Sequence, residues 1–240
     1  MKKFMNILID IFAFPVRFFE KLTDNKITLA LGIILVGAID LLLPDVANTF
    51  KVIFSGRSAG DVRFNAVMTV VVILALGIID VVFIGVPLFD IFKYLKKKET
   101  TMAVELSAQI NASGDNEGEE NPLLRLKRTG SAEHTASYIK VMKVYIMSHF
   151  FIVPVSTLLY YTFTRDITAD SASWLINLYM VIFMGISLWS AGVISRGVNV
   201  LFRFNLLFRR LTFIIVFIWN FIFSSVFSAL IMNWMLMLFR

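Results

Sequence analysis

The sequence predicts an all-α, polytopic membrane protein with five transmembrane helices preceded by an N-terminal amphipathic helix at the membrane interface. Of its 240 residues, 58% are hydrophobic and 17% charged, whereas soluble domains carry roughly 45–50% and 25%. Five apolar blocks are each long enough to cross a hydrocarbon core of about 30 Å, because a helix rises about 1.5 Å per residue. Cysteine is absent, which excludes disulfides, thiolate metal sites and cysteine nucleophiles.

The first element, residues 1–27, is predicted to be a cytosolic amphipathic helix that lies on the membrane. One polar and one apolar stripe recur at helical spacing, which is typical of an interfacial helix. Pro15 kinks or restarts this helix. No small-residue cleavage site follows, so we expect the segment to be retained. The polar stripe consists of Lys3, Asn6, Asp10, Arg17, Lys21 and Asp24, and the apolar one of Phe4, Leu8, Ile11, Phe12, Phe18, Phe19 and Leu22.

The rest of the chain, 28–240, is predicted to form the five-helix transmembrane domain. Lys and Arg near helix ends are retained on the cytoplasmic side of a membrane. Five of these residues precede the first span, nine lie between the second and third, and four between the fourth and fifth, against five on the other side. This distribution predicts a cytoplasmic N-terminus and an extracytoplasmic C-terminus. The spans are expected at about 28–46, 66–92, 138–163, 173–194 and 211–239.

The net charge of +6 follows mainly from this topology. It also predicts attraction to anionic membrane lipid, and it does not indicate nucleic-acid binding. The segment between the second and third spans, 93–137, is predicted to be a partly disordered cytosolic loop, because Asn111–Pro122 offers almost no apolar surface to bury. It is either a tether that binds a partner or a solvated linker.

Ionisable side chains inside the apolar blocks are the candidate functional residues. Asp80 and His149 lie near the centres of the second and third blocks, Asp40 lies further out in the first, and Asn220 lies in the fifth. A central Asp costs roughly 2.5–3.5 kcal/mol on insertion scales, so such residues mark function by default. One interpretation is an Asp80–His149 pair that binds or relays a proton, with Asn220 hydrogen-bonded to it. The other is packing between helices, at roughly 0.6–2 kcal/mol per hydrogen bond.

A short internal similarity relates the four residues that end at Asp40 to the four that end at Asp80. The two segments read Gly37-Ala38-Ile39-Asp40 and Gly77-Ile78-Ile79-Asp80. Four-residue matches arise easily by chance in a chain rich in Ile, Leu and Val. We therefore do not treat the similarity as a repeat.

Catalytic motifs are missing from the sequence. It contains no H-E-x-x-H, no G-x-S-x-G, no phosphate-binding G-x-x-x-x-G-K-S/T and no acidic cluster with metal spacing. His134 and His149 are the two histidines, too few for a histidine-rich metal site. We therefore expect no enzymatic activity and no cofactor.

Three segments carry a family resemblance. They are Phe14-Pro15-Val16-Arg17-Phe18-Phe19-Glu20-Lys21-Leu22 before the first span, Ala136-Ser137-Tyr138-Ile139-Lys140-Val141 leading to Val153-Pro154 in the third, and Trp189-Ser190-Ala191-Gly192-Val193-Ile194-Ser195-Arg196-Gly197 at the end of the fourth. With the five spans, this pattern resembles the bacterial branch of the Yip family of Ypt/Rab-interacting membrane proteins. The resemblance covers most of the chain, and the charged segment Glu99–Arg128 departs from it.

The resemblance implies a non-enzymatic scaffold, or an accessory or regulatory subunit of another membrane complex such as an ABC-type exporter. It also implies a bacterial plasma membrane, with membrane lipid and another integral membrane protein as partners. Candidate contacts are Arg196, Arg203, Arg209 and Arg210, although retention of positive charge on the inner side explains them without a partner. The alternative function is a small proton-coupled transporter or channel that uses Asp80 and His149.

Overall fold

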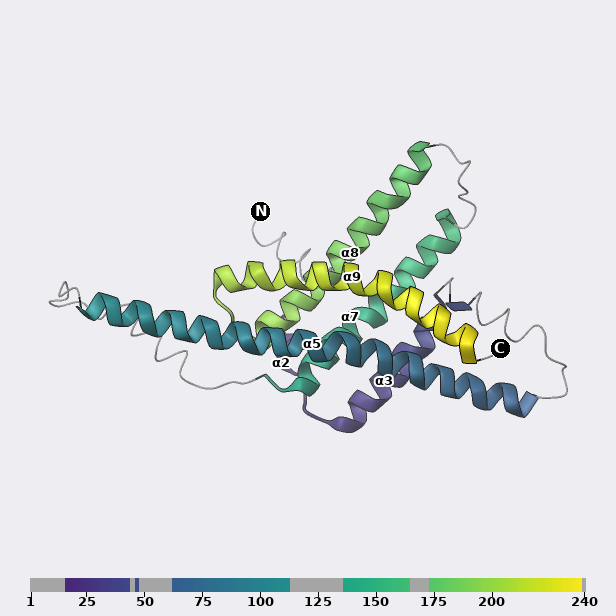
Figure 1. The fold of residues 1–240 in the computed structure, drawn as a ribbon, viewed down its shortest axis with the longest axis horizontal. Helices are drawn as coiled ribbons and strands as arrows, with labels where there is room; N and C mark the ends of the chain where they lie inside the picture. The colour runs from purple at the N-terminus through teal and green to yellow at the C-terminus, as the bar shows by residue number, and fades with distance from the viewer. Residues whose placement is uncertain (1–15, 44–45, 48–61, 113–135, 165–172, 239–240) are drawn as a thin grey trace.

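The computed structural model describes residues 16–43, 46–47, 62–112, 136–164 and 173–238, and nearly all of them are helical. The predicted all-α class is confirmed for this part of the chain. Residues 1–15 of the predicted interfacial helix lie outside it. The elements are α2 (Val16–Glu20), α3 (Lys26–Asp40), α5 (Val62–Ala112), α7 (Tyr138–Leu159), the π-helical turn η2 (Tyr160–Thr164), α8 (Ser173–Phe202) and α9 (Leu206–Leu238) (Figure 1).

Four stretches in the described residues are long and apolar enough to cross a membrane: Ala66–Leu106, Tyr138–Thr162, Ser173–Phe202 and Leu206–Phe223. They coincide with the second to fifth predicted spans. The first predicted span, 28–46, overlaps α3, which has 15 residues and ends at Asp40. That is a length of about 22 Å, less than a hydrocarbon core of about 30 Å. The described helices therefore include four spans where the sequence predicts five.

Helix α5 is much longer than the predicted second span, 66–92. It has 51 residues, a length of about 76 Å, which is more than twice the thickness of the hydrocarbon core. The first part of the predicted loop, 93–112, is therefore a continuation of this helix. Its Lys, Glu, Ala and Met residues have high helix propensity. The rest of that loop up to residue 135 lies outside the described residues.

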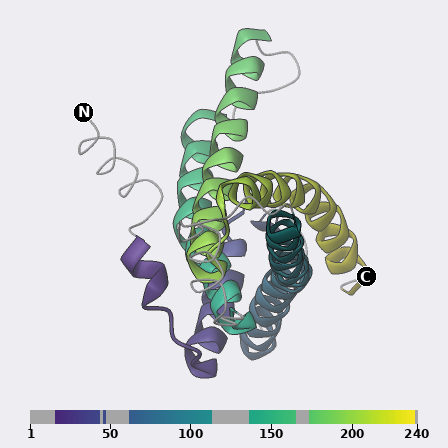
Figure 2. The same ribbon diagram turned by 90° about the vertical axis from the view of Figure 1, so that its left-hand side faces the viewer.

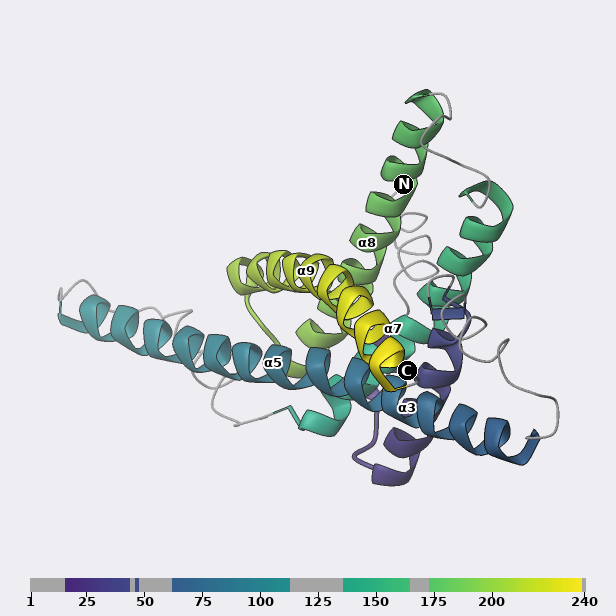
Figure 3. The same ribbon diagram turned by 45° about the vertical axis from the view of Figure 1, so that its right-hand side comes forward.

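The helices are not arranged as a parallel bundle. Helices α5 and α9 extend along the long axis of the molecule, whereas α7 and α8 lie side by side and project away from them (Figures 1 and 2). A view from another side shows the same two projecting helices (Figure 3). The core lies where the α-helices meet, and each α-helix contributes buried side chains to it, including Phe19 of α2, Val36 of α3, Leu88 of α5, Val144 of α7, Val198 of α8 and Val216 of α9.

Large apolar side chains remain exposed on the outward faces of the spans. Leu158 of α7, Val181 of α8 and Ile214 of α9 are examples, each at least half exposed. Such extensive apolar surface is unfavourable in water, but in a bilayer it contacts lipid chains. The four apolar helices and their exposed faces together indicate an integral membrane protein.

Two glycines allow α3 and α5 to cross with their backbones in contact. A Cβ atom added to Gly37 would overlap the carbonyl oxygen of Ile73, and one added to Gly77 would overlap that of Ile33. The contact is reciprocal, because each glycine meets the carbonyl four residues before the other. Small residues at crossings of membrane helices permit this close approach.

The turn between α8 and α9, residues 203–205, is held against α5. Arg203 ends α8 with a left-handed φ of 52°, a common way for a helix to stop. Glu99 Oε1 accepts a hydrogen bond from the Asn205 backbone N–H at 2.6 Å, and Lys96 Nζ donates to the Arg203 carbonyl at 3.3 Å. Lys96 and Glu99 also pair with each other at 2.8 Å. The helical continuation of α5 therefore anchors the connection between the last two spans.

Removing this anchor is expected to destabilise the protein. Glu99→Ala leaves the Asn205 N–H without its carboxylate and breaks the pair with Lys96, which should lower the free energy of unfolding by about 2 kcal/mol, as for hydrogen bonds to charged groups. The control is Glu105→Ala, since Glu105 is exposed on the same helix and should change stability little. Unfolding in mixed detergent micelles measures both. Equal effects of the two substitutions would contradict the anchoring role.

Candidate functional site

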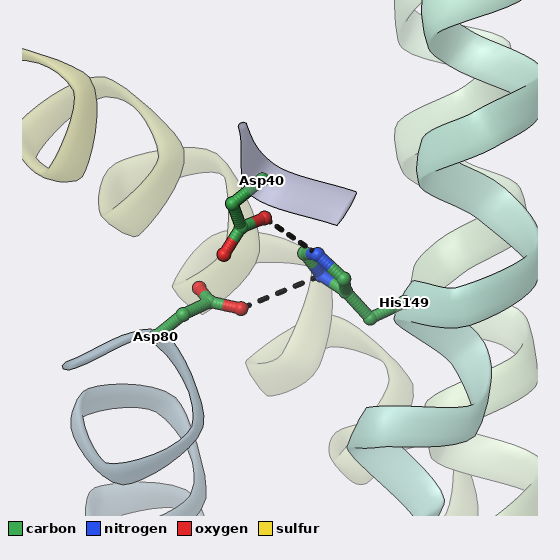
Figure 4. A group of neighbouring side chains, drawn as sticks. All are labelled: Asp40, Asp80 and His149. Atoms are coloured by element: carbon green, nitrogen blue, oxygen red, sulfur yellow. Dashed lines mark hydrogen bonds and ion pairs between the residues drawn. The ribbon is translucent and has the colours of Figure 1, made fainter. Parts of the chain in front are cut away.

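Three ionisable side chains from three helices meet inside the protein. Asp40 is the last residue of α3, Asp80 lies within α5 and His149 lies within α7. His149 Nε2 lies 2.8 Å from Asp40 Oδ1, and His149 Nδ1 lies 3.4 Å from Asp80 Oδ2 (Figure 4). Three of the four predicted members of the polar cluster are therefore together, with the imidazole next to both carboxylates.

A fourth side chain, Tyr145, completes this group. Its hydroxyl donates to Asp80 Oδ2 at 2.7 Å and lies 3.2 Å from His149 Nδ1. Tyr145 precedes His149 by four residues, so the two side chains share one face of α7. Sequence reasoning missed this residue, although its spacing from His149 could have identified it.

The crossing of α3 and α5 places the two carboxylates. Asp40 and Asp80 each follow a contact glycine by three residues, which is close to one helical turn. Because Gly37 and Gly77 meet at the crossing, Asp40 and Asp80 are both brought to His149. The four similar residues that end at Asp40 and at Asp80 thus form the crossing and contribute both carboxylates to the site.

The cluster is almost completely shielded. The side chains of Asp40, Asp80 and His149 are 1%, 5% and 10% exposed. An isolated charge at such a position is very unfavourable, so buried charges are paired or neutralised by a proton. Both ring nitrogens of His149 face oxygen atoms, so a doubly protonated ring has an acceptor for each N–H. An imidazolium between the carboxylates is therefore the pairing that this geometry accommodates best.

One carboxylate oxygen in the site has no partner. Asp40 Oδ2 is buried and makes no hydrogen bond within the described part of the chain. The carboxylates of Asp40 and Asp80 point toward one another beside the imidazole (Figure 4). Two facing carboxylates repel unless a proton or another cation is shared between them. The site therefore has the capacity to take up a further positive charge.

A metal ion is the second kind of positive charge that this site could take up. Asp40, Asp80 and His149 each offer one ligand atom, and these atoms lie within 4.8 Å of one another. However, a metal ion would need one imidazole nitrogen and one oxygen from each carboxylate at once, and it would replace the contact that this nitrogen already makes with its own oxygen partner. The observed hydrogen bonds favour a proton.

Asn220 does not join the cluster. Its Nδ2 donates to Ser190 Oγ at 3.3 Å, and its Oδ1 has no hydrogen-bond partner among the described residues. Asn220 therefore bonds to α8 and is separate from the cluster. The predicted hydrogen bond from Asn220 to the Asp80–His149 pair is wrong. Its position in the apolar block could not show which neighbouring helix it faces.

The four predicted arginine contacts occupy two places. Arg196 is half-buried within α8, whereas Arg203, Arg209 and Arg210 are exposed at the start of α9 and in the turn before it. Arg209 Nε donates to the Phe204 carbonyl at 2.9 Å. Of these three, Arg203 lies in the α8–α9 turn that Lys96 and Glu99 contact, and Arg209 and Arg210 lie in the first residues of α9 after it.

Comparison with known proteins finds no match among family models, curated proteins or solved structures. The resemblance to the Yip family stays a prediction. The helices and the cluster define an integral membrane protein with an ionisable site between its helices.

Proposed function

We propose that this protein is a proton-coupled membrane transporter or channel in which Asp40, His149 and Asp80 bind and relay a proton. The observation that carries the proposal is the position of one imidazole between two buried carboxylates from different helices. Ionisable groups at such depth are costly, and in pumps and transporters they form proton relays.

The hydrogen bonds provide a route for the proton. With His149 doubly protonated, its Nδ1 gives a proton to the oxygen of Tyr145 while Tyr145 gives its own hydroxyl proton to Asp80. This leaves a neutral imidazole, an unchanged tyrosine and a protonated Asp80. On the other side of the ring, Nε2 exchanges a proton with Asp40. Transfer along this line connects α3 and α5 through two residues of α7.

We further propose that the chain crosses the membrane five times, with its N-terminus in the cytoplasm and its C-terminus outside. The Lys and Arg distribution supports this orientation. The first crossing would be made by the predicted span 28–46, most of whose residues lie in α3. The resemblance to the bacterial branch of the Yip family supports a bacterial plasma membrane.

Proton flux into proteoliposomes tests the relay. Asp80→Asn and His149→Gln should each reduce flux driven by a membrane potential by about 10²-fold, the lower end of what a positioned acid or base contributes. The control is Asn220→Ala, which removes a polar group of a span without touching the cluster and should leave flux unchanged. Wild-type flux in both cluster variants would contradict the proposal.

A scaffold or accessory subunit of another membrane complex, such as an ABC-type exporter, is the second candidate. Helices α7 and α8 project beside the rest of the molecule (Figure 2). Their exposed apolar side chains, such as Leu158 and Val181, support the scaffold as surfaces that another membrane helix could contact. The same preparation distinguishes the two functions. No flux from the wild-type protein, together with a stable membrane-protein complex on affinity purification, would favour the scaffold over the relay.

A further inference from the structure

A group of exposed basic residues lies in the turn between α8 and α9, at the start of α9 and on the part of α5 that contacts the turn. We call this surface the basic corner, and it consists of Lys93, Lys97, Lys98, Arg203, Arg209 and Arg210, all of them exposed. The contacts of Lys96 and Glu99 with the turn bring the two chain segments together. The six residues therefore lie near the same end of α8 and the same part of α5, although they come from α5, the turn and α9.

The charge of this surface is largely uncompensated by its own residues. Segments 93–99 and 203–210 contain seven basic residues and one acidic residue, Glu99. Glu99 is already occupied, because one of its oxygens accepts from Lys96 and the other from the Asn205 N–H. Glu99 is thus already paired with groups of the protein. The six exposed basic residues keep a strongly positive surface.

Exposed apolar side chains lie beside these charges. Tyr94, Leu206 and Leu207 are 64%, 68% and 67% exposed. Tyr94 follows Lys93, and the two leucines stand between Arg203 and Arg209 in the chain. Two candidate spans, Ser173–Phe202 and Leu206–Phe223, are separated here by three residues, so the turn emerges where both helices leave the hydrocarbon. Basic and apolar side chains at one such level match the boundary between headgroups and acyl chains.

We propose that the basic corner binds the phosphate groups of anionic phospholipids, while Tyr94, Leu206 and Leu207 contact their acyl chains. Arginine suits this role because its planar guanidinium pairs with phosphate through two parallel hydrogen bonds. The apolar neighbours favour a lipid over a free phosphate ion, which has no acyl chain to cover them. This inference does not depend on the proton relay, because none of its residues belongs to the cluster.

Lipid retention by the purified full-length protein tests the site. Native mass spectrometry in detergent should show that the wild-type protein retains phosphatidylglycerol at least tenfold more than phosphatidylcholine. The triple substitution Lys97→Gln, Arg203→Gln and Arg210→Gln should lower the affinity for phosphatidylglycerol by about two orders of magnitude, at roughly fivefold for each basic residue removed near an anionic surface.

Two further variants separate a local site from total charge and from misfolding. Arg17→Gln, Lys21→Gln and Lys26→Gln remove the same charge from exposed residues of the N-terminal segment and should keep the preference. The variant Arg203→Lys, Arg210→Lys and Lys97→Arg keeps the charge at all three positions. It should retain most of the preference for phosphatidylglycerol. Equal loss in both glutamine triples, equal retention of the two lipids by the wild-type protein, or competition by inorganic phosphate at the lipid's own concentration would each overturn the proposal.

Discussion

Replacing His149 with leucine is expected to lower the free energy of unfolding by about 3–5 kcal/mol. The substitution removes the cation from between Asp40 and Asp80 and leaves two buried carboxylates that face each other. Breaking a buried charge pair by removing one partner has this cost, because the remaining charge stays uncompensated. Titration of the protein in mixed micelles with a denaturing detergent measures the loss.

A fully neutral cluster should be less damaging than the single substitution. The triple variant Asp40→Asn, Asp80→Asn and His149→Leu carries no buried charge, so we expect it to recover at least half of the stability that His149→Leu loses. Contacting residues show such non-additive effects, whereas independent sites do not. The triple variant should still lack proton flux, which separates stability from transport. Additive destabilisation by the three substitutions would contradict a coupled cluster.

Gly37→Ala is expected to have the second-largest effect, a loss of about 3 kcal/mol. The added methyl group would overlap the backbone carbonyl of Ile73, and backbone cannot rotate away as a flexible side chain can. Overpacking typically costs about 1–3 kcal/mol, and we expect the upper end of this range because the two helices must move apart. Because Asp40 follows Gly37 by three residues, separation of α3 from α5 should also reduce proton flux.

The matched control for this substitution is Gly192→Ala in α8. A Cβ atom at Gly192 meets no atom within 4 Å, so alanine there should stabilise the helix by about 0.5–1 kcal/mol. Gly77→Ala should resemble Gly37→Ala, because the contact between the two glycines is reciprocal. Similar stabilities for the Gly37 and Gly192 variants would show that the backbones do not touch.

The spans could be located from sequence because apolar composition is a local property. Four of the five predicted blocks coincide with helices long enough to cross a membrane. The first block does not coincide with a helix of that length, because α3 ends at Asp40 after 15 residues. The extension of α5 through residues 93–112 is not visible in hydropathy because the segment is charged, although its Lys, Glu, Ala and Met residues favour a helix.

The site was predictable in part, for a different reason. Asp40, Asp80 and His149 stand out in apolar blocks because charge is costly there, whatever the fold. Tyrosine carries no charge at neutral pH, so Tyr145 did not stand out in the same way. Asn220 was assigned to the cluster from its depth alone, and depth leaves open which way a side chain faces.

The sequence by itself therefore determined the class of protein, the positions of most spans and the residues whose burial needs an explanation, since each follows from hydrophobicity and charge along the chain. Only the tertiary structure decided which of those residues meet. The crossing at Gly37 and Gly77 brings two carboxylates 40 residues apart to one imidazole. Such a crossing depends on how two helix surfaces pack against each other, and a four-residue match in either helix alone does not specify its partner.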